Sequence, residues 1–222
     1  MSELKRKAAE RAVEFVEDGM TLGLGTGSTT FFAIEAIGSL VKKGYDLQGV
    51  PTSVASEQQA RKCGIPLTTL DDVDGIDLTI DGADEVDGDL NLIKGLGGAL
   101  LREKIVAYAS KQEIIIVDEA KMVQTLGTKS PLPIEVTRFG HVLTARNIRS
   151  LGCVPELKGG NDPFITDNGN YVYNCRFEGI DNPHALDRQL KSIPGVVETG
   201  LFLGLATKAV VAYPDRTIVL EK

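Results

Sequence analysis

The sequence has 222 residues, 42% hydrophobic and 25% charged, with a formal net charge of −7 and a pI near 5.0. That length allows one α/β domain or a larger domain with a smaller companion, and the composition indicates a folded, soluble chain. The acidic balance argues against nucleic-acid binding, and no apolar run approaches membrane-spanning length, so we expect neither a nucleic-acid nor a membrane partner.

The first half of the chain alternates between helical and extended patterns. The predicted elements are a helix over 4–16, a strand over 21–24, a helix over 28–43, a strand over 47–50, a helix ending at Gly64, a strand over 76–80, a helix over 99–110 and a strand over 113–117. Strands that alternate with helices predict a mostly parallel sheet covered on both faces. The charged first eleven residues lack the apolar stretch of a signal peptide, so a cytoplasmic location is expected.

A second unit is predicted to begin at the proline-rich segment 130–133, because proline ends helices and favours linkers. Its predicted elements are a strand over 132–137, a helix over 140–151, strands over 153–158 and 171–176, a helix over 183–192 and a strand over 196–202. This order is that of a ferredoxin-like α+β domain. Asn168-Gly169 is a type I′ hairpin signal, which favours adjacent antiparallel strands.

Two last strands, over 209–213 and 217–220, could return to the first sheet. The predicted domains are therefore 1–129 plus about 203–222, and 130–202. The three cysteines are odd in number and form no CxxC pair, so neither a disulfide framework nor a zinc site is indicated. His141 and His184 stand apart without a neighbouring histidine, and we expect no metal site.

The segment Gly23-Leu24-Gly25-Thr26-Gly27-Ser28-Thr29 follows a strand and opens a helix. Backbone N–H groups at such a helix start can bind a phosphate. The spacing fits neither GxGxxG nor a Walker motif, which argues against dinucleotide or P-loop chemistry. A tight strand-to-helix turn without a ligand is the alternative.

An acidic segment, Asp81-Gly82-Ala83-Asp84-Glu85-Val86-Asp87, comes directly after the strand over 76–80. Asp81 and Asp84 are thus predicted at the carboxyl end of that strand, where α/β sheets bind ligands. Such carboxylates can bind sugar hydroxyls or exchange protons during ring opening. The alternative is a solvated turn, since the spacing of Gly82 and Ala83 does not fit a calcium loop.

The segment Lys94-Gly95-Leu96-Gly97-Gly98 is a second glycine-rich turn, and its amides and lysine could stabilise an oxyanion. Glu103 follows about one turn into the next helix. Its helical neighbours at i±3 and i±4 are all apolar, which would raise its proton affinity towards that of a working base. Lys121 follows the strand over 113–117 and could neutralise a substrate charge, although a solvated surface lysine is the common alternative, and the same holds for Lys5.

GLGTGSTT (23–30), DGADEVD (81–87), KGLGGALLREKI (94–105) and DEAKMV around Lys121 together resemble type A ribose 5-phosphate isomerase. PLPIEV (131–136), TDNGN (166–170) and IPGVVETGLF (193–202) extend the likeness over nearly the whole chain. The resemblance implies a Rossmann-like domain with a smaller α+β domain, no metal or other cofactor, a sugar-phosphate substrate and a homo-oligomer, dimer or tetramer.

The resemblance also implies roles for individual residues. Glu103 would be the general base, with Asp81, Asp84 and Lys94 as further catalytic residues. Lys5 approximates a phosphate-contacting lysine. The implied substrate-binding residues are Thr26, Gly27, Ser28, Thr29, Asp81, Gly82, Ala83, Asp84, Lys94, Gly95, Leu96, Gly97 and Lys121. One departure is Leu96, which replaces a glycine of the family's turn and makes a left-handed backbone there unfavourable.

The expected reaction interconverts D-ribose 5-phosphate and D-ribulose 5-phosphate through a cis-enediolate, in the non-oxidative pentose phosphate pathway. Ring opening would be assisted by Asp81 or Asp84. Two alternatives stay open: a CoA-transferase-like enzyme with Glu103 as nucleophile, and a sugar-phosphate-binding sensor without catalytic activity.

Overall fold

The computed structural model describes residues 2–222, and the chain divides into two compact units. The first contains the residues up to Ala83, Arg102–Lys121 and Gly204–Lys222, and the second contains Asp84–Leu101 and Met122–Leu203. The expected boundaries placed residues 84–101 and 122–129 in the first unit. These two segments fold with the second unit because their strands pair with strands of that unit and Glu85 accepts a hydrogen bond from Gly127 within it.

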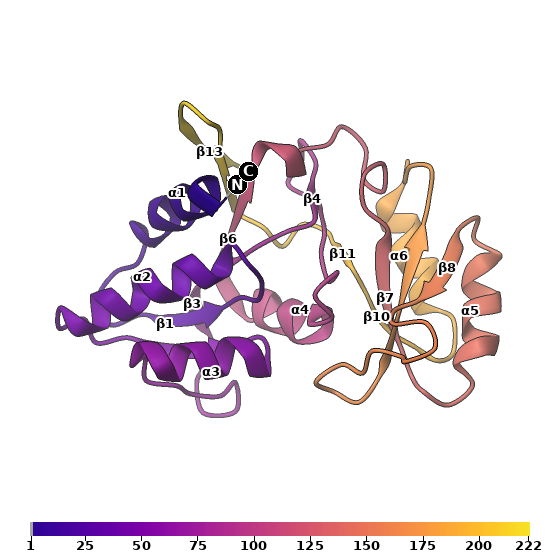
Figure 1. The fold of residues 1–222 in the computed structure, drawn as a ribbon, viewed down its shortest axis with the longest axis horizontal. Helices are drawn as coiled ribbons and strands as arrows, with labels where there is room; N and C mark the ends of the chain where they lie inside the picture. Colours follow the sequence, from indigo (N-terminus) through magenta and orange to yellow (C-terminus); the bar gives the residue numbers. More distant parts are fainter. Residues whose placement is uncertain (1) are drawn as a thin grey trace. The chain divides into compact units, whose positions relative to one another are not determined.

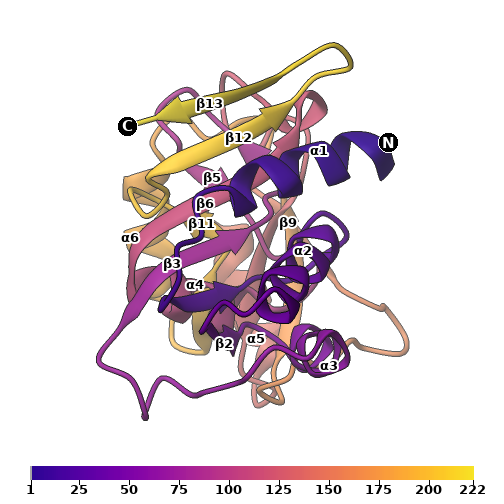
Figure 2. The ribbon, with the colours of Figure 1, turned by 90° about the vertical axis from the view of Figure 1, so that its left-hand side faces the viewer.

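The first unit is built on a six-stranded sheet with the order β13-β12-β6-β3-β1-β2 (Figures 1 and 2). Its strands are β1 (Thr21–Leu24), β2 (Gln48–Pro51), β3 (Ile76–Asp81), β6 (Ser110–Asp118), β12 (Lys208–Ala212) and β13 (Thr217–Glu221). Its helices are α1 (Ser2–Val13), α2 (Thr30–Lys42), α3 (Val54–Cys63), the short η1 (Glu119–Lys121) and α4 (Leu100–Tyr108), which enters this unit at Arg102. Every pair except β12 with β13 is parallel, which confirms the predicted Rossmann-like sheet.

The alternation of side chains along β1 explains why helices cover both faces of this sheet. Leu22 and Leu24 point into the large core beneath α1, α2 and α3, which lie side by side (Figures 1 and 2). Gly23 points to the other face, where a Cβ would come within 2.7 Å of Val106 on α4 and 1.8 Å of the Thr79 hydroxyl. Glycine at 23 therefore lets α4 approach the sheet closely.

The second unit has a four-stranded antiparallel sheet with the order β10-β7-β9-β8. Its elements are β7 (Leu132–Val136), α5 (His141–Arg149), β8 (Val154–Leu157), β9 (Tyr171–Arg176), α6 (Pro183–Lys191) and β10 (Val196–Thr199). This strand order and the strand-helix-strand-strand-helix-strand sequence confirm the ferredoxin-like domain. Alternate residues of β7, among them Ile134 and Val136, are buried in a core with residues of both helices.

A small three-stranded sheet, β11-β5-β4, completes the second unit. It consists of β4 (Glu85–Val86), β5 (Leu92–Ile93) and β11 (Leu201–Phe202), all antiparallel. Sequence patterning did not predict β4 and β5, and it joined β11 to the preceding strand, because two-residue strands have no periodicity to read.

The hairpin interpretation of Asn168-Gly169 was half right. β8 and β9 do pair antiparallel, but residues 158–170 connect them as a long loop, and Asn168-Gly169 lies in a turn inside it. The Gly169 N–H donates to the Thr166 carbonyl at 2.9 Å. A type I′ turn needs a positive φ at both central residues. Among the described non-glycine residues only Leu90 has a positive φ, so Asn168 does not have one and the turn is not of type I′.

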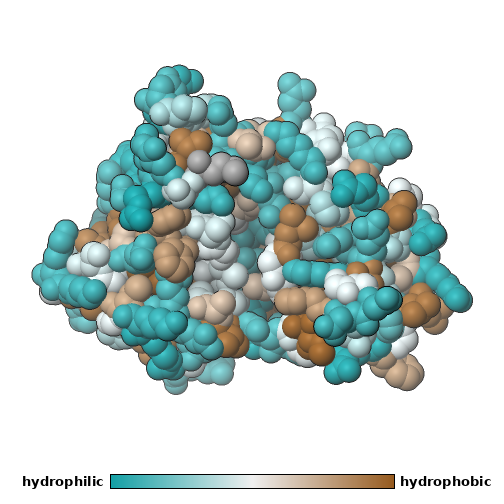
Figure 3. All heavy atoms as spheres, in the orientation of Figure 1, coloured by the Kyte–Doolittle hydropathy of each residue, from teal (hydrophilic) through white to brown (hydrophobic). Residues whose placement is uncertain are grey.

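The face of the molecule in Figure 3 is mostly hydrophilic, with hydrophobic residues in small separate patches. No helix within residues 2–222 is long and apolar enough to cross a membrane. Cys153 and Cys175 are buried in the core of the second unit, and Cys63 packs partly buried against the core of the first.

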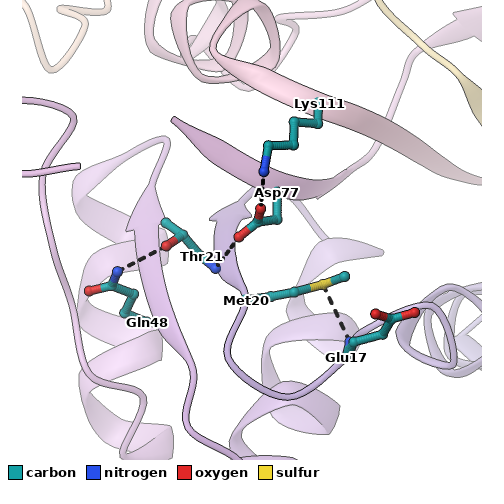
Figure 4. A network of polar contacts seen from close by, with 6 residues as sticks. All are labelled: Glu17, Met20, Thr21, Gln48, Asp77 and Lys111. Carbon is teal, nitrogen blue, oxygen red and sulfur yellow. Dashed lines mark hydrogen bonds and ion pairs between the residues drawn. The ribbon is translucent and has the colours of Figure 1, made fainter. Parts of the chain in front are cut away.

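A polar network ties together the amino ends of the strands in the first unit (Figure 4). The Asp77 carboxylate accepts hydrogen bonds from the Thr21 N–H at 2.8 Å and from the Lys111 ammonium at 2.7 Å. Gln48 donates to the Thr21 hydroxyl at 2.9 Å. One carboxylate thus links β1, β3 and β6 at the edge opposite to the predicted site, and the Lys111 and Thr21 bonds lower the pKa of Asp77.

Asp77→Asn should therefore destabilise the protein in a pH-dependent way. Because the folded pKa is lowered, the carboxylate stabilises the fold above its ordinary pKa, and this contribution disappears as the pH falls through the lowered value. We expect a loss of about 1 kcal/mol near pH 7, given the exposure of Lys111, and a vanishing difference well below pH ~3.9. Urea unfolding of both proteins across pH 3–7 measures it, and a difference that grows on acidification would contradict it.

Candidate active site

The first glycine turn joins β1 to α2 in the first unit and leaves several backbone donors unused. The N-cap residue Thr29 makes no side-chain capping hydrogen bond. Within residues 2–222, the N–H groups of Gly27, Ser28 and Thr29 donate no hydrogen bond. Lys5 on α1 donates to the Ser28 hydroxyl at 2.8 Å. The turn thus presents free amides and one ammonium group at a helix N-terminus, which suits an anion.

Asp81 holds this turn in place. Its carboxylate is fully buried at the end of β3, and Oδ1 accepts from the N–H groups of Thr26 at 3.1 Å and Gly82 at 2.7 Å. A Cβ on Gly25 would come within 2.3 Å of this carboxylate, so residue 25 must be glycine for the turn to pass so close. The Thr26 hydroxyl is also used internally, lying 2.7 Å from that of Thr52 and 2.8 Å from that of Ser53.

A pocket of about 750 Å³ opens over the same turn. Its lining includes Lys5, residues 25–28, Phe31 and Lys62, all in the first unit. Two lysines and a run of unused amides make this pocket positive and rich in donors, whereas the chain as a whole is acidic.

In the second unit, Asp84 holds the other glycine turn. Asp84 is partly exposed, and its Oδ2 accepts a hydrogen bond from the Leu96 N–H at 3.0 Å. Its own N–H donates to the Ile93 carbonyl at 2.8 Å, which fixes it beside β5. Asp81 and Asp84 therefore belong to different units and hold different turns, a division that the sequence did not reveal.

Glu85, the next residue of the acidic segment, has a structural role. It is fully buried, and its two carboxylate oxygens accept hydrogen bonds from the backbone N–H groups of Gly127 at 2.6 Å, Lys129 at 2.7 Å and Ser130 at 2.5 Å. Three backbone donors on one carboxylate fix the loop that leads into β7. Sequence reasoning singled out Glu85 only as a member of its motif.

Lys94 is almost fully buried, with 2% of its surface exposed, and its ammonium lies 5.2 Å from the centre of the Phe202 ring. Its N–H donates to the Gly200 carbonyl at 2.9 Å, so the backbone is fixed between β5 and β11. A lysine so deeply buried is rare in proteins and commonly has a functional reason.

The turn after Lys94 accommodates Leu96 without strain. Gly95 and Gly98 take positive φ values of 101° and 91°, whereas Leu96 does not adopt positive φ. The left-handed backbone conformations of the turn therefore fall on its glycines. This is what the leucine at position 96 requires, since it replaces a glycine of the family's turn.

Glu103 lies in the first turn of α4, and only 5% of its surface is exposed. Three of its four predicted helical neighbours, Leu100, Val106 and Ala107, are buried with it, and Ala99 is partly exposed. The carboxyl group is thus kept away from bulk water.

Lys121 ends η1, directly after β6, and its side chain is partly buried. It therefore lies at the carboxyl edge of the first unit's sheet, the same edge that carries Thr26 and Asp81. Because β1, β3 and β6 are parallel neighbours, their carboxyl ends meet at one edge.

Sequence reasoning missed two residues around the second turn. Lys158 donates to the Leu96 carbonyl, and a Cβ on Gly98 would lie only 2.3 Å from the Phe164 ring. Both belong to the long loop between β8 and β9, and a separation of 62 residues from Leu96 leaves no local sequence signal. Within residues 2–222, no group of three or more His, Cys, Asp or Glu side chains could hold a metal ion.

In parallel α/β sheets, a donor-rich helix start at the carboxyl edge is a common binding site for small phosphorylated molecules, and the buried carboxylates beside it are groups that enzymes use. The profile of the ribose 5-phosphate isomerase A (phosphoriboisomerase A) family matches residues 48–216. The chain belongs to this family, and it is an isomerase.

Relatives agree over almost the full length. Ribose 5-phosphate isomerase A of Parvibaculum lavamentivorans is 50% identical over 98% of this chain and 97% of its own. That of Bacillus mycoides is 53% identical over 95% of this chain and 96% of its own. These matches favour the isomerase over the transferase and sensor alternatives.

Solved structures match as closely. Ribose 5-phosphate isomerase from Plasmodium falciparum has a TM-score of 0.96 at 42% identity, covering 100% of this chain and 99% of that one. Another D-ribose 5-phosphate isomerase, solved in complex with phospho-erythronic acid, has a TM-score of 0.96 at 42% identity, covering 99% and 98%.

The role of Glu85 can be tested by Glu85→Gln, which keeps the shape but replaces one acceptor oxygen by an NH₂ group facing a backbone donor. We expect a loss of about 2–4 kcal/mol in the free energy of unfolding, the cost of buried donors left unsatisfied next to a lost charge. Denaturant unfolding measures it. The exposed Asp89→Asn in the same hairpin is the control, and equal stabilities of the two variants would contradict the assignment.

Proposed function

We propose that the protein interconverts D-ribose 5-phosphate and D-ribulose 5-phosphate, with Glu103 as the general base. The reaction class, aldose–ketose isomerisation in the pentose phosphate pathway, follows from family membership. The observation that carries the assignment of the base is the burial of Glu103 in the helix that directly follows a glycine turn. A carboxyl group kept out of bulk water can exchange its proton with a bound substrate rather than with solvent.

The substrate phosphate binds at the first glycine turn. The unused N–H groups of Gly27, Ser28 and Thr29 and the Lys5 ammonium supply donors and positive charge for it. Thr26 contributes by shaping the turn, since its N–H and hydroxyl are already engaged. Gly82 and Ala83 continue the chain from Asp81 and are partly exposed, so their backbone can contact the sugar.

Ring opening is assisted by Asp84, whereas Asp81 acts as a positioning residue. This choice rests on exposure: the Asp81 side chain is fully buried around the turn that it holds, and Asp84 is partly open to solvent. A residue that trades a proton with the sugar ring must be reachable by it.

The isomerisation step moves one proton between two carbons and one between two oxygens. Glu103 removes the proton from C2 of the open-chain aldose, and the electron pair shifts onto the C1 carbonyl oxygen to form a cis-enediolate. The Lys94 ammonium and the amides of the turn at 95–97 stabilise the negative oxygen. Glu103 then returns the proton to C1 while the O2 hydroxyl proton passes to O1, which leaves a carbonyl at C2 and a hydroxyl at C1. Lys121, at the sheet edge, adds positive charge for the substrate.

A homo-oligomer and a cytoplasmic location also remain predictions. Three apolar side chains at the start of α5 support the first: Phe139 is 95% exposed, and Val142 and Leu143 are more than half exposed. Adjacent exposed apolar residues of this kind are typical of surfaces that associate.

Glu103→Gln should lower kcat by about 10²–10⁴-fold and leave KM within a few-fold, because the amide keeps the shape but cannot take the proton. Ketopentose formation from ribose 5-phosphate in the presence of a chelator measures both constants. Glu57→Gln, a partly exposed glutamate of α3 that pairs with Arg61, is the control and should retain activity. A near-normal kcat for Glu103→Gln would refute the base.

Lys5→Met should raise KM for ribose 5-phosphate by about 10-fold or more, the scale of one charge-assisted contact, with a smaller effect on kcat. Steady-state kinetics at low salt gives the two constants. Lys7→Met removes a lysine of the same helix whose partner is the exposed Glu3, and it should leave KM unchanged. If the two variants behave alike, Lys5 does not contact the phosphate.

A further inference from the structure

Leu96 is held on both sides by charged side chains of the second unit. Its N–H donates to Asp84 Oδ2 at 3.0 Å, and its carbonyl accepts from the Lys158 ammonium at 2.5 Å. The two peptide planes that flank Leu96 are thus fixed by one carboxylate and one ammonium group. No other residue of the turn has both its N–H and its C=O bound by charged side chains in the described part of the chain.

Lys158 is itself firmly placed. Its N–H donates to the Val172 carbonyl at 2.9 Å, and its ammonium lies 4.2 Å from the centre of the Phe164 ring. Phe164 in turn packs against Gly98, where no side chain would fit. Burial lowers the pKa of Lys158, and the negative charge of Asp84 offsets part of that effect, which favours the ammonium form that can donate.

The loop that carries Lys158 is anchored from its other end by Glu135. This fully buried carboxylate of β7 accepts hydrogen bonds through Oε1 from the Thr166 hydroxyl and the Asn170 amide, both at 2.9 Å. A lysine on a loop with this support can hold its partner in one orientation, as a positioning residue must.

The orientation of the Leu96 carbonyl determines that of the next N–H. In a trans peptide the C=O and the following N–H point in opposite directions. Because the Leu96 carbonyl is directed at Lys158, the Gly97 N–H is directed away from it. Gly97 is exposed, and its N–H donates no hydrogen bond within residues 2–222.

We propose that Lys158 is a positioning residue, which fixes the Leu96–Gly97 peptide so that the Gly97 N–H serves as the oxyanion donor of the second turn. This inference rests on the proposed isomerase function and adds the residue that orients the donor. A glycine at 96 would leave the backbone of the turn more conformational freedom. Leu96, together with its hydrogen bonds to Asp84 and Lys158, restricts the turn to one geometry, and we call this pair of hydrogen bonds the clamp.

Three variants test the proposal by kinetics. Lys158→Met keeps the apolar stem and the packing on Phe164 but removes the donor, and kcat should fall about 10–100-fold with KM nearly unchanged, since a misplaced donor acts on the transition state. Lys158→Arg can still donate to the carbonyl and should restore most of kcat. Lys191→Met removes a lysine of the same unit that only pairs with Asp187 and Glu198, and kcat should stay normal.

A second measurement does not depend on turnover. In ¹H–¹⁵N NMR spectra of the full chain, the Leu96 and Gly97 amide signals should shift in Lys158→Met and stay near their original positions in Lys158→Arg. Phospho-erythronic acid carries a carboxylate, which is negative as the enediolate oxygen is. On titration with it, the wild-type Gly97 signal should move, and the affinity should fall in Lys158→Met. If Lys158→Met does not fold, Lys158→Leu, which also lacks a donor, takes its place.

The outcomes separate the two proposals. A folded Lys158→Met with unchanged kcat and unchanged Leu96 and Gly97 signals overturns the role of Lys158 while the isomerase function stands. An inactive wild-type protein overturns the isomerase function, and the amide signals alone then decide on Lys158: signals that move with its substitution support the clamp, and unmoved signals reject it.

Discussion

The buried Asp81 carboxylate is the interaction on which the first half of the candidate site depends. It lies at the end of β3 and accepts two backbone N–H groups, one from its own strand end and one from the turn that follows β1. Burying a charge without partners would be costly, and these donors compensate the cost only in this arrangement. The strand ends, the turn and the start of α2 are thereby fixed together. The free amides above the turn are a consequence of that fixed backbone.

Neighbouring residues of the acidic segment have different roles. Asp81 holds the turn of the first unit, Asp84 holds the turn of the second and stays partly exposed, and Glu85 binds three backbone donors. A substitution at each would have a different signature in stability and in kinetics. The acidic segment looks like one patch in the sequence. In the structure its carboxylates have three separate roles, and each role is determined by the backbone N–H groups that the carboxylate binds.

Much of the fold could be predicted from periodicity. The alternation of apolar runs with helical patterns correctly predicted the parallel sheet and the ferredoxin-like unit. Patterning alone left open whether the last two strands return to the first sheet, and β12 and β13 do so. The two-residue strands β4 and β5 were missed because they are shorter than any period. Site residues next to a strand end, such as Asp81, were predicted at the correct edge. The contact between Lys158 and Leu96 could not be, since only the tertiary fold brings such distant positions together.

The path of the chain through the first unit has a consequence for synthesis. The strand β6 pairs with β3 on one side and with β12 on the other, and β12 comes after the whole second unit in the sequence. A growing chain can form β1, β2, β3 and β6 early, but the outer edge of β6 stays open until Lys208–Ala212 has left the ribosome. Such an edge can pair with strands of other chains. The time needed to synthesise the intervening ferredoxin-like unit therefore sets how long the nascent protein is open to such pairing.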